Sequence, residues 1–406
     1  SHDTVTAAIR PRSVERGSLR SAHCSPEPPH SRKETPHEDS KTPSPRGSRR
    51  QLAGIVLAVS LITSACGGDD AGSDSAASRP TTTAAPTTTA PPATTSSPST
   101  TTPPTTATSV DVAAAVDCVS VPTEISEFVL DAGGAEHDVR VYVPTTFDGS
   151  ELPLVMNFHG FGSNGQQQAA FTGYEELAEE ESFIVVHPTA VPASTDAQGR
   201  NSWETVAVDD PAKDDVAFTN ELLDLLTEDY CVDETRVYAT GMSGGGLFTS
   251  QLVCAMSDRL AAALSVAAIS YPDSCDPAEP LPFVAIHGTD DPTVPFDGDL
   301  TGTRFEGEQF VETLFSEPMP DQFAQFAVAM GCDPEGVRVQ TSTDIYTTTY
   351  TGCDDGVPLA YYEVVGGGHA WPSSPFADPD SPIVEQLTEL QGYTTFDIDA
   401  TADAWA

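Results

Sequence analysis

Residues 236–246 read Arg-Val-Tyr-Ala-Thr-Gly-Met-Ser-Gly-Gly-Gly, a G-x-S-x-G pattern centred on Ser243. An apolar run precedes the pattern, and a stretch with helical character, residues 246–254, follows it. A strand that turns sharply into a helix holds such a serine on a strained, exposed tip, and the flanking glycines avoid clashes that a Cβ would cause. A glycine-rich turn with an incidental serine would also match the bare pattern. The strand before it and the helix after it favour a nucleophile elbow with Ser243 as the nucleophile.

Apolar runs alternate with amphipathic stretches on both sides of this elbow. Continuous apolar strands separated by helices are typical of a mostly parallel sheet that is covered on both faces. We therefore predict an α/β domain. The expected strands are an opening hairpin at 121–144, then 152–158, 183–187, 236–240, 261–269, 281–287, a hairpin at 337–351, and 359–365. The expected helices are 168–180, 214–230, 246–254, 321–330 and a shortened last helix at 400–406.

A serine hydroxyl becomes a good nucleophile when an imidazole takes its proton and a carboxylate fixes the tautomer of that imidazole. His369 follows the expected strand 359–365 in Gly-Gly-Gly-His-Ala-Trp-Pro, and it is the only histidine after His287. We expect a flexible glycine loop to bring its ring over Ser243. The alternative is a surface histidine on a mobile loop.

The expected strand 281–287 ends in Gly-Thr-Asp-Asp-Pro, residues 288–292. Side chains just beyond the carboxyl end of a parallel strand line the active-site edge of such a sheet. Asp291 is the expected acid, and Asp290 remains an alternative.

The negative oxygen formed during ester attack needs two fixed N–H donors. One comes from the residue after the nucleophile, Gly244, and the other from an early strand-to-helix loop. The loop His159-Gly160-Phe161 ends the expected strand 152–158, so we predict that Phe161 supplies the second donor. His159 is interpreted as structural.

Several motifs together resemble the secreted polyhydroxybutyrate depolymerase and feruloyl esterase group of α/β-hydrolases. They are the elbow, His159-Gly160, residues 287–291 with Val294-Pro295, and residues 366–372. The resemblance extends over about 121–405 and implies an α/β-hydrolase fold, for which the order Ser243, Asp291, His369 is the expected one. It also assigns the catalytic aspartate to Asp291.

Two positions depart from that group's pattern. Phe161 stands where a cysteine usually follows His-Gly, and Gly244 stands where a non-glycine residue often follows the serine. Both flank the expected oxyanion hole, so the departures bear on the choice of substrate.

Six cysteines lie in the expected domain, and an even number in an exported protein indicates disulfides. Fifteen pairings are possible. Proximity in sequence favours Cys254–Cys275 and Cys332–Cys353, which leaves Cys118–Cys231. The absence of a C-x-x-C motif argues against a metal site.

Composition divides the chain into very different parts. The first fifty residues carry 10 of the 18 Lys and Arg and no Met, Trp, Tyr or Phe, so we expect 1–47 to be a disordered basic extension. Residues 117–406 carry 51 Asp and Glu against 7 Lys and Arg, a surplus of 44 negative charges. Such a surplus repels nucleic acid, and the acidic residues show no ordered spacing for a cation.

Residues 48–66 combine a basic start, a short apolar run and small residues, which together predict an export signal. Cys66 resembles the acylated cysteine of bacterial lipoproteins, although Thr63 departs from the usual leucine. Residues 67–116 are almost wholly Thr, Pro, Ala, Ser and Gly, and we expect an extended linker. The catalytic domain is then 117–406, outside the cell, either secreted or held to the membrane through Cys66.

Two tryptophans in expected loops, Trp203 and Trp371, are candidates for stacking on the substrate. Packing beneath a loop is the alternative for both. Residues 296–319 are long enough to form a lid or a specificity loop.

These observations predict a monomeric extracellular serine esterase without a metal or organic cofactor. Its expected partner is an ester substrate, with hydroxyalkanoate esters or polyester oligomers first and feruloyl or acetyl esters of plant polysaccharide as the alternative. A non-catalytic cell-surface binding module would lack a member of the triad, and a peptidase would normally carry a gating domain.

Overall fold

The computed structural model describes Cys118 and residues 121–205, 208, 210–272, 274–298, 317–378, 381 and 383–405. All of these belong to one compact unit of the chain. The basic extension, the export signal, Cys66, the linker and the boundaries expected between them lie outside the described residues. Among the residues described, no helix has the length and apolar character needed to span a membrane.

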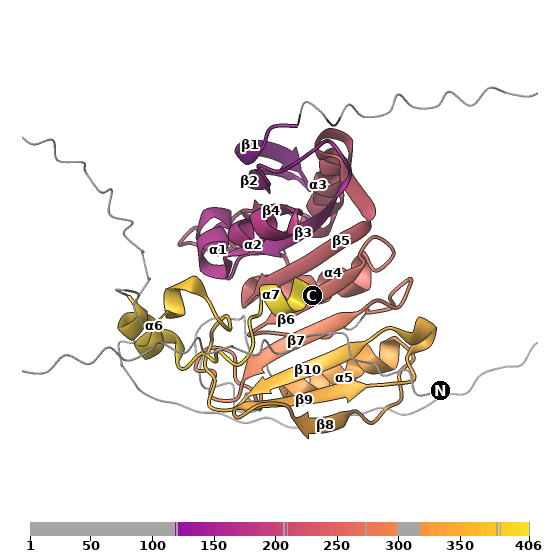
Figure 1. The fold of residues 1–406 in the computed structure, drawn as a ribbon, viewed down its shortest axis with the longest axis vertical. Helices are drawn as coiled ribbons and strands as arrows, with labels where there is room; N and C mark the ends of the chain where they lie inside the picture. Colours follow the sequence, from indigo (N-terminus) through magenta and orange to yellow (C-terminus); the bar gives the residue numbers. More distant parts are fainter. Residues whose placement is uncertain are drawn as a thin grey trace, which may run out of the picture. The chain divides into compact units, whose positions relative to one another are not determined.

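Ten strands of the described chain form one mixed sheet in the order β1-β2-β4-β3-β5-β6-β7-β10-β9-β8 (Figure 1). The six strands from β4 to β10 are parallel, and antiparallel pairs complete both edges. The strands are β1 (Glu124–Ala132), β2 (Ala135–Val143), β3 (Leu152–Phe158), β4 (Ile184–Pro188), β5 (Val232–Met242), β6 (Ala262–Val266), β7 (Phe283–Gly288), β8 (Val337–Gln340), β9 (Ile345–Tyr350) and β10 (Leu359–Val364). The predicted mostly parallel α/β sheet is confirmed.

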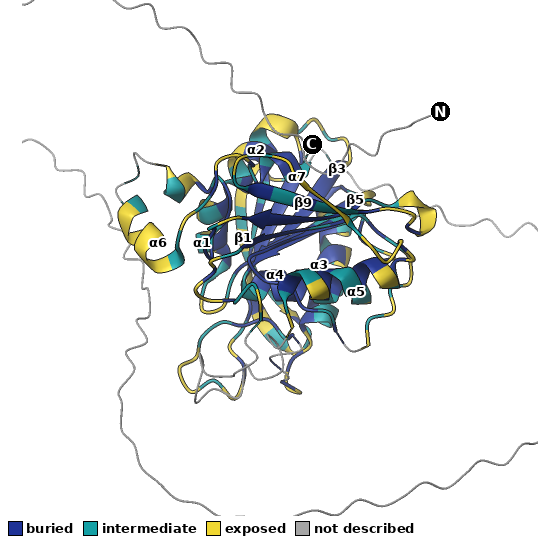
Figure 2. Ribbon diagram, turned by 90° about the horizontal axis from the view of Figure 1, so that it is seen from below, coloured by how far each residue is buried: buried dark blue, intermediate teal, exposed yellow. Residues whose placement is uncertain are grey.

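Helices cover both faces of this sheet, and each face has its own apolar core. Figure 2 shows α3, α4 and α5 on one side of the sheet, and α2 and α7 on the other. The helices are α1 (Gly165–Thr172), α2 (Tyr174–Glu181), α3 (Asp215–Tyr230), α4 (Gly244–Ala255), α5 (Met319–Ala329), α6 (Val384–Gln391) and α7 (Ala402–Trp405), with short 3-10 turns η2 (Asp354–Gly356) and η3 (Pro375–Ala377). The continuous apolar strands β3 and β4 are buried along their whole length, as strands covered on both faces must be.

One expected helix differs from the prediction. The stretch 168–180 forms the two helices α1 and α2, which meet at Gly173. Gly173 has a left-handed backbone, φ 71°, and its N–H bonds to the carbonyl of Ala169, which ends α1. The stretch holds no proline and only this one glycine, so the sequence pattern predicts a single helix.

The expected C-terminal helix is present as the short α7. Its Trp405 stacks on Phe183 at 4.2 Å between ring centroids and packs edge-on against Tyr238. Trp405 thus packs against the apolar core on this face of the sheet.

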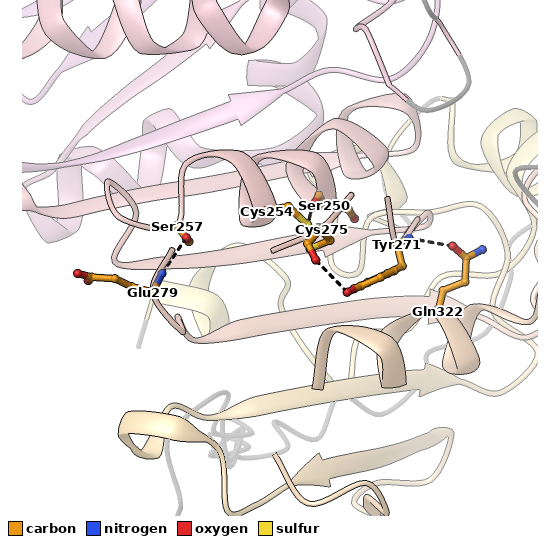
Figure 3. Close-up of a disulfide and its surroundings, with 7 residues drawn as sticks. All are labelled: Ser250, Cys254, Ser257, Tyr271, Cys275, Glu279 and Gln322. Carbon is orange, nitrogen blue, oxygen red and sulfur yellow. Dashed lines mark hydrogen bonds between the residues drawn. A yellow bond between two sulfur atoms is a disulfide. The ribbon is translucent and has the colours of Figure 1, made fainter. Parts of the chain in front are cut away.

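Three disulfides join the pairs expected from the sequence, Cys118–Cys231, Cys254–Cys275 and Cys332–Cys353. Figure 3 shows the second, which ties the end of α4 to the loop before β7. Tyr271, beside this disulfide, is held at both ends. Its backbone N–H donates to the side chain of Gln322 on α5, and its hydroxyl donates to the carbonyl of Cys275. The disulfide therefore fixes a loop between two helices of the same face.

Candidate active site

Ser243 lies on the tight turn between β5 and α4. Its backbone has φ 58° and ψ −121°, a conformation that a non-glycine residue adopts only under strain. Its N–H donates to the carbonyl of Val266, at 2.9 Å, and so holds the turn against β6. A Cβ on Gly245 would overlap the carbonyl oxygen of Phe158 on β3. The elbow predicted from the sequence is therefore formed, and its glycine is required by close approach of the backbone.

His369 and Asp291 form a buried, hydrogen-bonded pair. Nδ1 of His369 lies 2.8 Å from Oδ2 of Asp291, and the two residues are 7% and 3% exposed. Asp291 follows β7 and His369 follows β10, and these strands are parallel neighbours. The carboxyl ends of β5, β7 and β10 share one sheet edge, which brings Ser243, Asp291 and His369 to that edge.

The structure places Asp291, rather than Asp290, against the imidazole. Oδ1 of Asp291 accepts the backbone N–H groups of Thr293 and Val294, at 2.7 and 2.8 Å. Burial alone would raise the pKa of this carboxyl, but the hydrogen bond and charge of His369 outweigh burial and lower the pKa. Asp290 is exposed and uses its backbone N–H to bond Gly367.

A second histidine, His287, approaches the same carboxylate. Its Nε2 lies 3.5 Å from Oδ2 of Asp291 and donates to the carbonyl of Val294 at 3.0 Å. Burial lowers the pKa of His287, although Asp291 opposes that shift. His287 thus packs against the carboxylate of Asp291. In the sequence, His287 stands at the end of an apolar strand. That position alone does not predict a role for it in the site.

The loop that carries His369 is packed tightly, which corrects the expectation of a flexible glycine loop. A Cβ on Gly288 would overlap the carbonyls of Gly367 and Gly368, and one on Gly368 would overlap the carbonyl of Gln391. The N–H groups of Gly368 and His369 bond to the carbonyls of Tyr393 and Gln391, at 2.7 and 2.6 Å. The glycines therefore allow backbones to touch, and they hold the imidazole in place.

Among the described residues, the His369 side chain bonds to Asp291 and not to Ser243. Hydrogen bonds between nucleophile and base are often long in sites without substrate and shorten when substrate binds. With Nδ1 engaged by Asp291, Nε2 is the nitrogen left to accept a proton from Ser243.

The two expected oxyanion donors lie next to each other. An ideal Cβ built on Gly244 would lie 3.1 Å from the backbone nitrogen of Phe161. On the other side of the nucleophile, one built on Gly160 would lie 3.3 Å from the Cβ of Ser243. The loop 159–164, here called the oxyanion loop, thus packs directly against the elbow. Glycine at 244 leaves the Phe161 backbone room to approach, which accounts for this departure from the pattern.

His159 supports the oxyanion loop, as expected. It is fully buried, its Nε2 accepts the N–H of Ala190 at 3.0 Å, and its Nδ1 lies 2.7 Å from the carbonyl of Gly160. Burial lowers its pKa to about 4, so the ring is neutral.

The expected substrate contacts of Trp203 and Trp371 are wrong, because neither side chain reaches the surface. Trp203 is 2% exposed and Trp371 is fully buried. Their indole N–H groups bond to the carbonyl of His159 and the hydroxyl of Thr401, at 2.9 and 3.0 Å. Both loops fold back onto the core, because a large ring is stabilised by burial once its N–H has a partner.

Most of the expected lid, residues 299–316, lies outside the described residues. Its two ends meet, since the N–H of Met319 bonds to the carbonyl of Phe296 at 2.9 Å. The lid stays a prediction.

Comparison with known proteins agrees with this geometry. A family described as "Putative esterase" matches residues 132–298, which include the oxyanion loop, the elbow and Asp291. The matched segment is thus similar to this esterase family, and it is less than half of the chain. His369 lies beyond the segment that this family matches.

Two curated relatives of this chain are also named as esterases. The chain is 26% identical over 241 residues to a bifunctional acetylxylan esterase/xylanase of Neocallimastix patriciarum, which covers 59% of this chain. It is 28% identical over 245 residues to feruloyl esterase B of Piromyces equi, which covers 57% of this chain. The matches span 32% and 42% of the length of those relatives.

Among solved structures, the acetyl xylan esterase from Aspergillus awamori aligns with 61% of this chain and 94% of its own, at a TM-score of 0.42 and 16% identity.

Proposed function

We propose that this protein is an extracellular serine esterase that cleaves carboxylic esters through an acyl-enzyme. The observation that carries the proposal is the buried His369–Asp291 pair at the sheet edge where the Ser243 elbow ends, with the 2.8 Å hydrogen bond between imidazole and carboxylate. A binding module on the same fold would have no use for a strained serine at the same sheet edge as an oriented imidazole.

In the first half-reaction, Ser243 Oγ attacks the ester carbonyl carbon and transfers its proton to Nε2 of His369. Asp291 accepts the hydrogen bond from Nδ1–H and stabilises the imidazolium that forms. The N–H groups of Gly244 and Phe161 donate to the negative oxygen of the tetrahedral intermediate. The intermediate collapses, the carbon–oxygen bond to the alcohol breaks, and His369 returns the proton to the leaving alcohol.

In the second half-reaction, water attacks the acyl-enzyme and gives its proton to His369. The same two N–H groups hold the second negative oxygen. Collapse releases the carboxylic acid, and His369 returns the proton to Ser243 Oγ. The protein is regenerated with no other reactant than the ester and water.

For the substrate, we propose feruloyl or acetyl esters of plant polysaccharide. The names of the two curated relatives support this class. From the sequence, hydroxyalkanoate esters were the first expected substrates and plant polysaccharide esters the alternative. The names of the two relatives favour the alternative, because neither relative is named for a polyester.

The disulfides and the export signal in the sequence support a location outside the cell, where thiols are oxidised. Attachment through Cys66 stays a prediction. The intact mass of the N-terminal peptide of the exported protein, with or without an acyl chain on Cys66, tests it.

The test measures hydrolysis of methyl ferulate, acetylated xylan and a 3-hydroxybutyrate oligomer by the full chain. For each substrate, the rate of the wild type is compared with that of the Ser243→Ala variant. We expect turnover of the first or second ester and a loss of several orders of magnitude in the variant. Covalent labelling by an alkyl fluorophosphonate, located by peptide mass spectrometry, tests the nucleophile without choosing an ester. Labelling of Ser243 with turnover of the oligomer alone would overturn the proposed substrate. Absence of both labelling and turnover would overturn the esterase.

A further inference from the structure

Residues 201–204, here called the brace, hold the oxyanion loop from outside. The carbonyl of Asn201 accepts the N–H of Gly162, and its side-chain Nδ2 donates to the carbonyl of Ser163, both at 2.8 Å. Nε1 of Trp203 donates to the carbonyl of His159 at 2.9 Å. These three bonds fall on both sides of Phe161, the residue proposed to supply an oxyanion donor.

The Trp203 ring also bridges the two elements that carry the donors. It stacks on Phe248 of α4, with centroids 5.0 Å apart and an interplanar angle of 10°. It meets Phe158, the last residue of β3, edge-on at 5.2 Å. The helix that begins at Gly244 and the strand that leads to Phe161 thus pack on one buried indole.

A buried ion pair fixes the brace from behind. The ammonium of Lys213 donates to the carbonyls of Ser202 and Val191, and it lies 2.9 Å from Oδ2 of Asp215. The same carboxylate accepts the backbone N–H of Glu204. Lys213 is 6% exposed and Asp215, in the first turn of α3, is fully buried. Because each charge is paired and hydrogen-bonded, the brace is attached to α3 by groups that are costly to separate.

We infer that the brace sets the position of the Phe161 N–H in the oxyanion hole, and that Trp203 is a positioning residue for ester hydrolysis. The inference rests on the proposed function. A donor that stabilises a transition state must be held in place before the reaction, because its contribution falls steeply when it moves. A rigid ring with one N–H, packed between β3 and α4, meets that need.

The variant that tests this is Trp203→Phe, which keeps an aromatic ring and removes the N–H that bonds His159. We expect kcat for 4-nitrophenyl butyrate to fall about tenfold to a hundredfold, with KM within about twofold of the wild type. The rate of labelling by the fluorophosphonate, whose adduct also places an oxygen in the oxyanion hole, should fall by a similar factor.

The matched control is Trp405→Phe, the same replacement in a half-buried side chain that packs against the core on the other face of the sheet. Thermal unfolding of both variants is recorded, and rates are measured well below the lower midpoint. The inference is overturned if Trp203→Phe keeps the kcat and labelling rate of the wild type, or if only KM rises. A wild type that is neither labelled nor able to turn over an ester instead overturns the esterase proposal.

If Trp203→Phe does not fold, Asn201→Ala replaces it, since that change removes a single hydrogen bond to Ser163 at the half-buried edge of the brace. A lowered kcat with unchanged KM supports the brace, and wild-type kcat and labelling overturn it.

Discussion

Among single residues, the site depends on one carboxylate that is hydrogen-bonded at both oxygens. Asp291 accepts two backbone N–H groups on one oxygen and the imidazole of His369 on the other. His287 covers it from the side. A carboxylate held in this way cannot rotate away from the imidazole, so it fixes the tautomer that leaves Nε2 to act as a base.

Asp291→Asn should reduce kcat by about ten-thousand-fold, because an amide in this place does not hold the required tautomer or stabilise the imidazolium. The matched control is Asp290→Asn, next to it in sequence but exposed. We expect kcat of the control to stay within about twofold of the wild type, measured on 4-nitrophenyl butyrate. The reverse result, a dead Asp290→Asn and an active Asp291→Asn, would show the acid to be Asp290.

At the scale of elements, sharp backbone contacts decide where helices begin and end. The elbow works because Gly245 of α4 touches the end of β3, and α1 ends because Gly173 adopts a left-handed backbone. Both features make the loops at this edge of the sheet closely packed and not flexible. The proposed catalytic groups lie at the same edge.

Gly173→Ala should lower the free energy of unfolding by roughly 1–2 kcal/mol, because residue 173 has a left-handed backbone, φ 71°, that a residue with a Cβ adopts at a cost. The new Cβ would also lie 3.2 Å from Cγ of Pro375, which adds to the loss. Gly199→Ala is the control, because Gly199 has φ 65° and no atom within 4 Å of an added Cβ. Urea unfolding should therefore show the larger loss for Gly173→Ala, and equal losses would exclude crowding by Pro375.

The buried β4 carries a histidine that makes the fold sensitive to acid. Burial lowers the pKa of His187 to about 3, and neither of its nitrogens has a hydrogen-bond partner among the described residues. The folded protein therefore keeps His187 neutral while the unfolded chain takes up a proton below about pH 6.5. The stability that this group gives is complete above pH 6.5 and is lost as the pH falls towards 3.

His187→Leu should flatten this dependence. The unfolding free energy of the wild type should fall between pH 7 and pH 5 by about 2 kcal/mol more than that of the variant, because a single proton is no longer taken up on unfolding. Urea titrations at the two pH values measure the difference. An identical fall in both proteins would place the proton uptake on other groups, such as His159 or His137.

For the molecule as a whole, three disulfides cross-link the segments that surround a single sheet. Cys118–Cys231 joins the start of the described chain to the turn before β5, over 113 residues. The two other bonds each close 21 residues. Net charge of −43 opposes compaction, so links that restrict the unfolded chain offset part of that repulsion.

Replacing Cys118 and Cys231 together by Ser should therefore destabilise the fold more than replacing Cys332 and Cys353. In the loop-entropy description, the longer loop contributes about 1.5 kcal/mol more. Thermal unfolding of the two double variants, under oxidising conditions, checks the order of their midpoints. A lower midpoint for the Cys332/Cys353 variant would contradict it and would indicate that local packing of that hairpin dominates.

The sequence by itself determined the α/β sheet, the elbow at Ser243 and the choice of His369 as the expected base. Each of these depends on residues close together in the sequence. Apolar periodicity predicts strands, and a serine between glycines at the end of a strand predicts a tight turn. The pairing of the cysteines also followed from proximity along the chain.

The tertiary structure alone decided the rest of the site. The motif favoured Asp291 but left Asp290 open, and the path of the loop after β7 turns Asp291 to the imidazole. Trp203 and Trp371 stand in polar loops, yet both are buried, because burial depends on contacts with residues distant in sequence. The attachment of the brace to Lys213 and Asp215 arises in the same way, from groups that meet only when the chain folds.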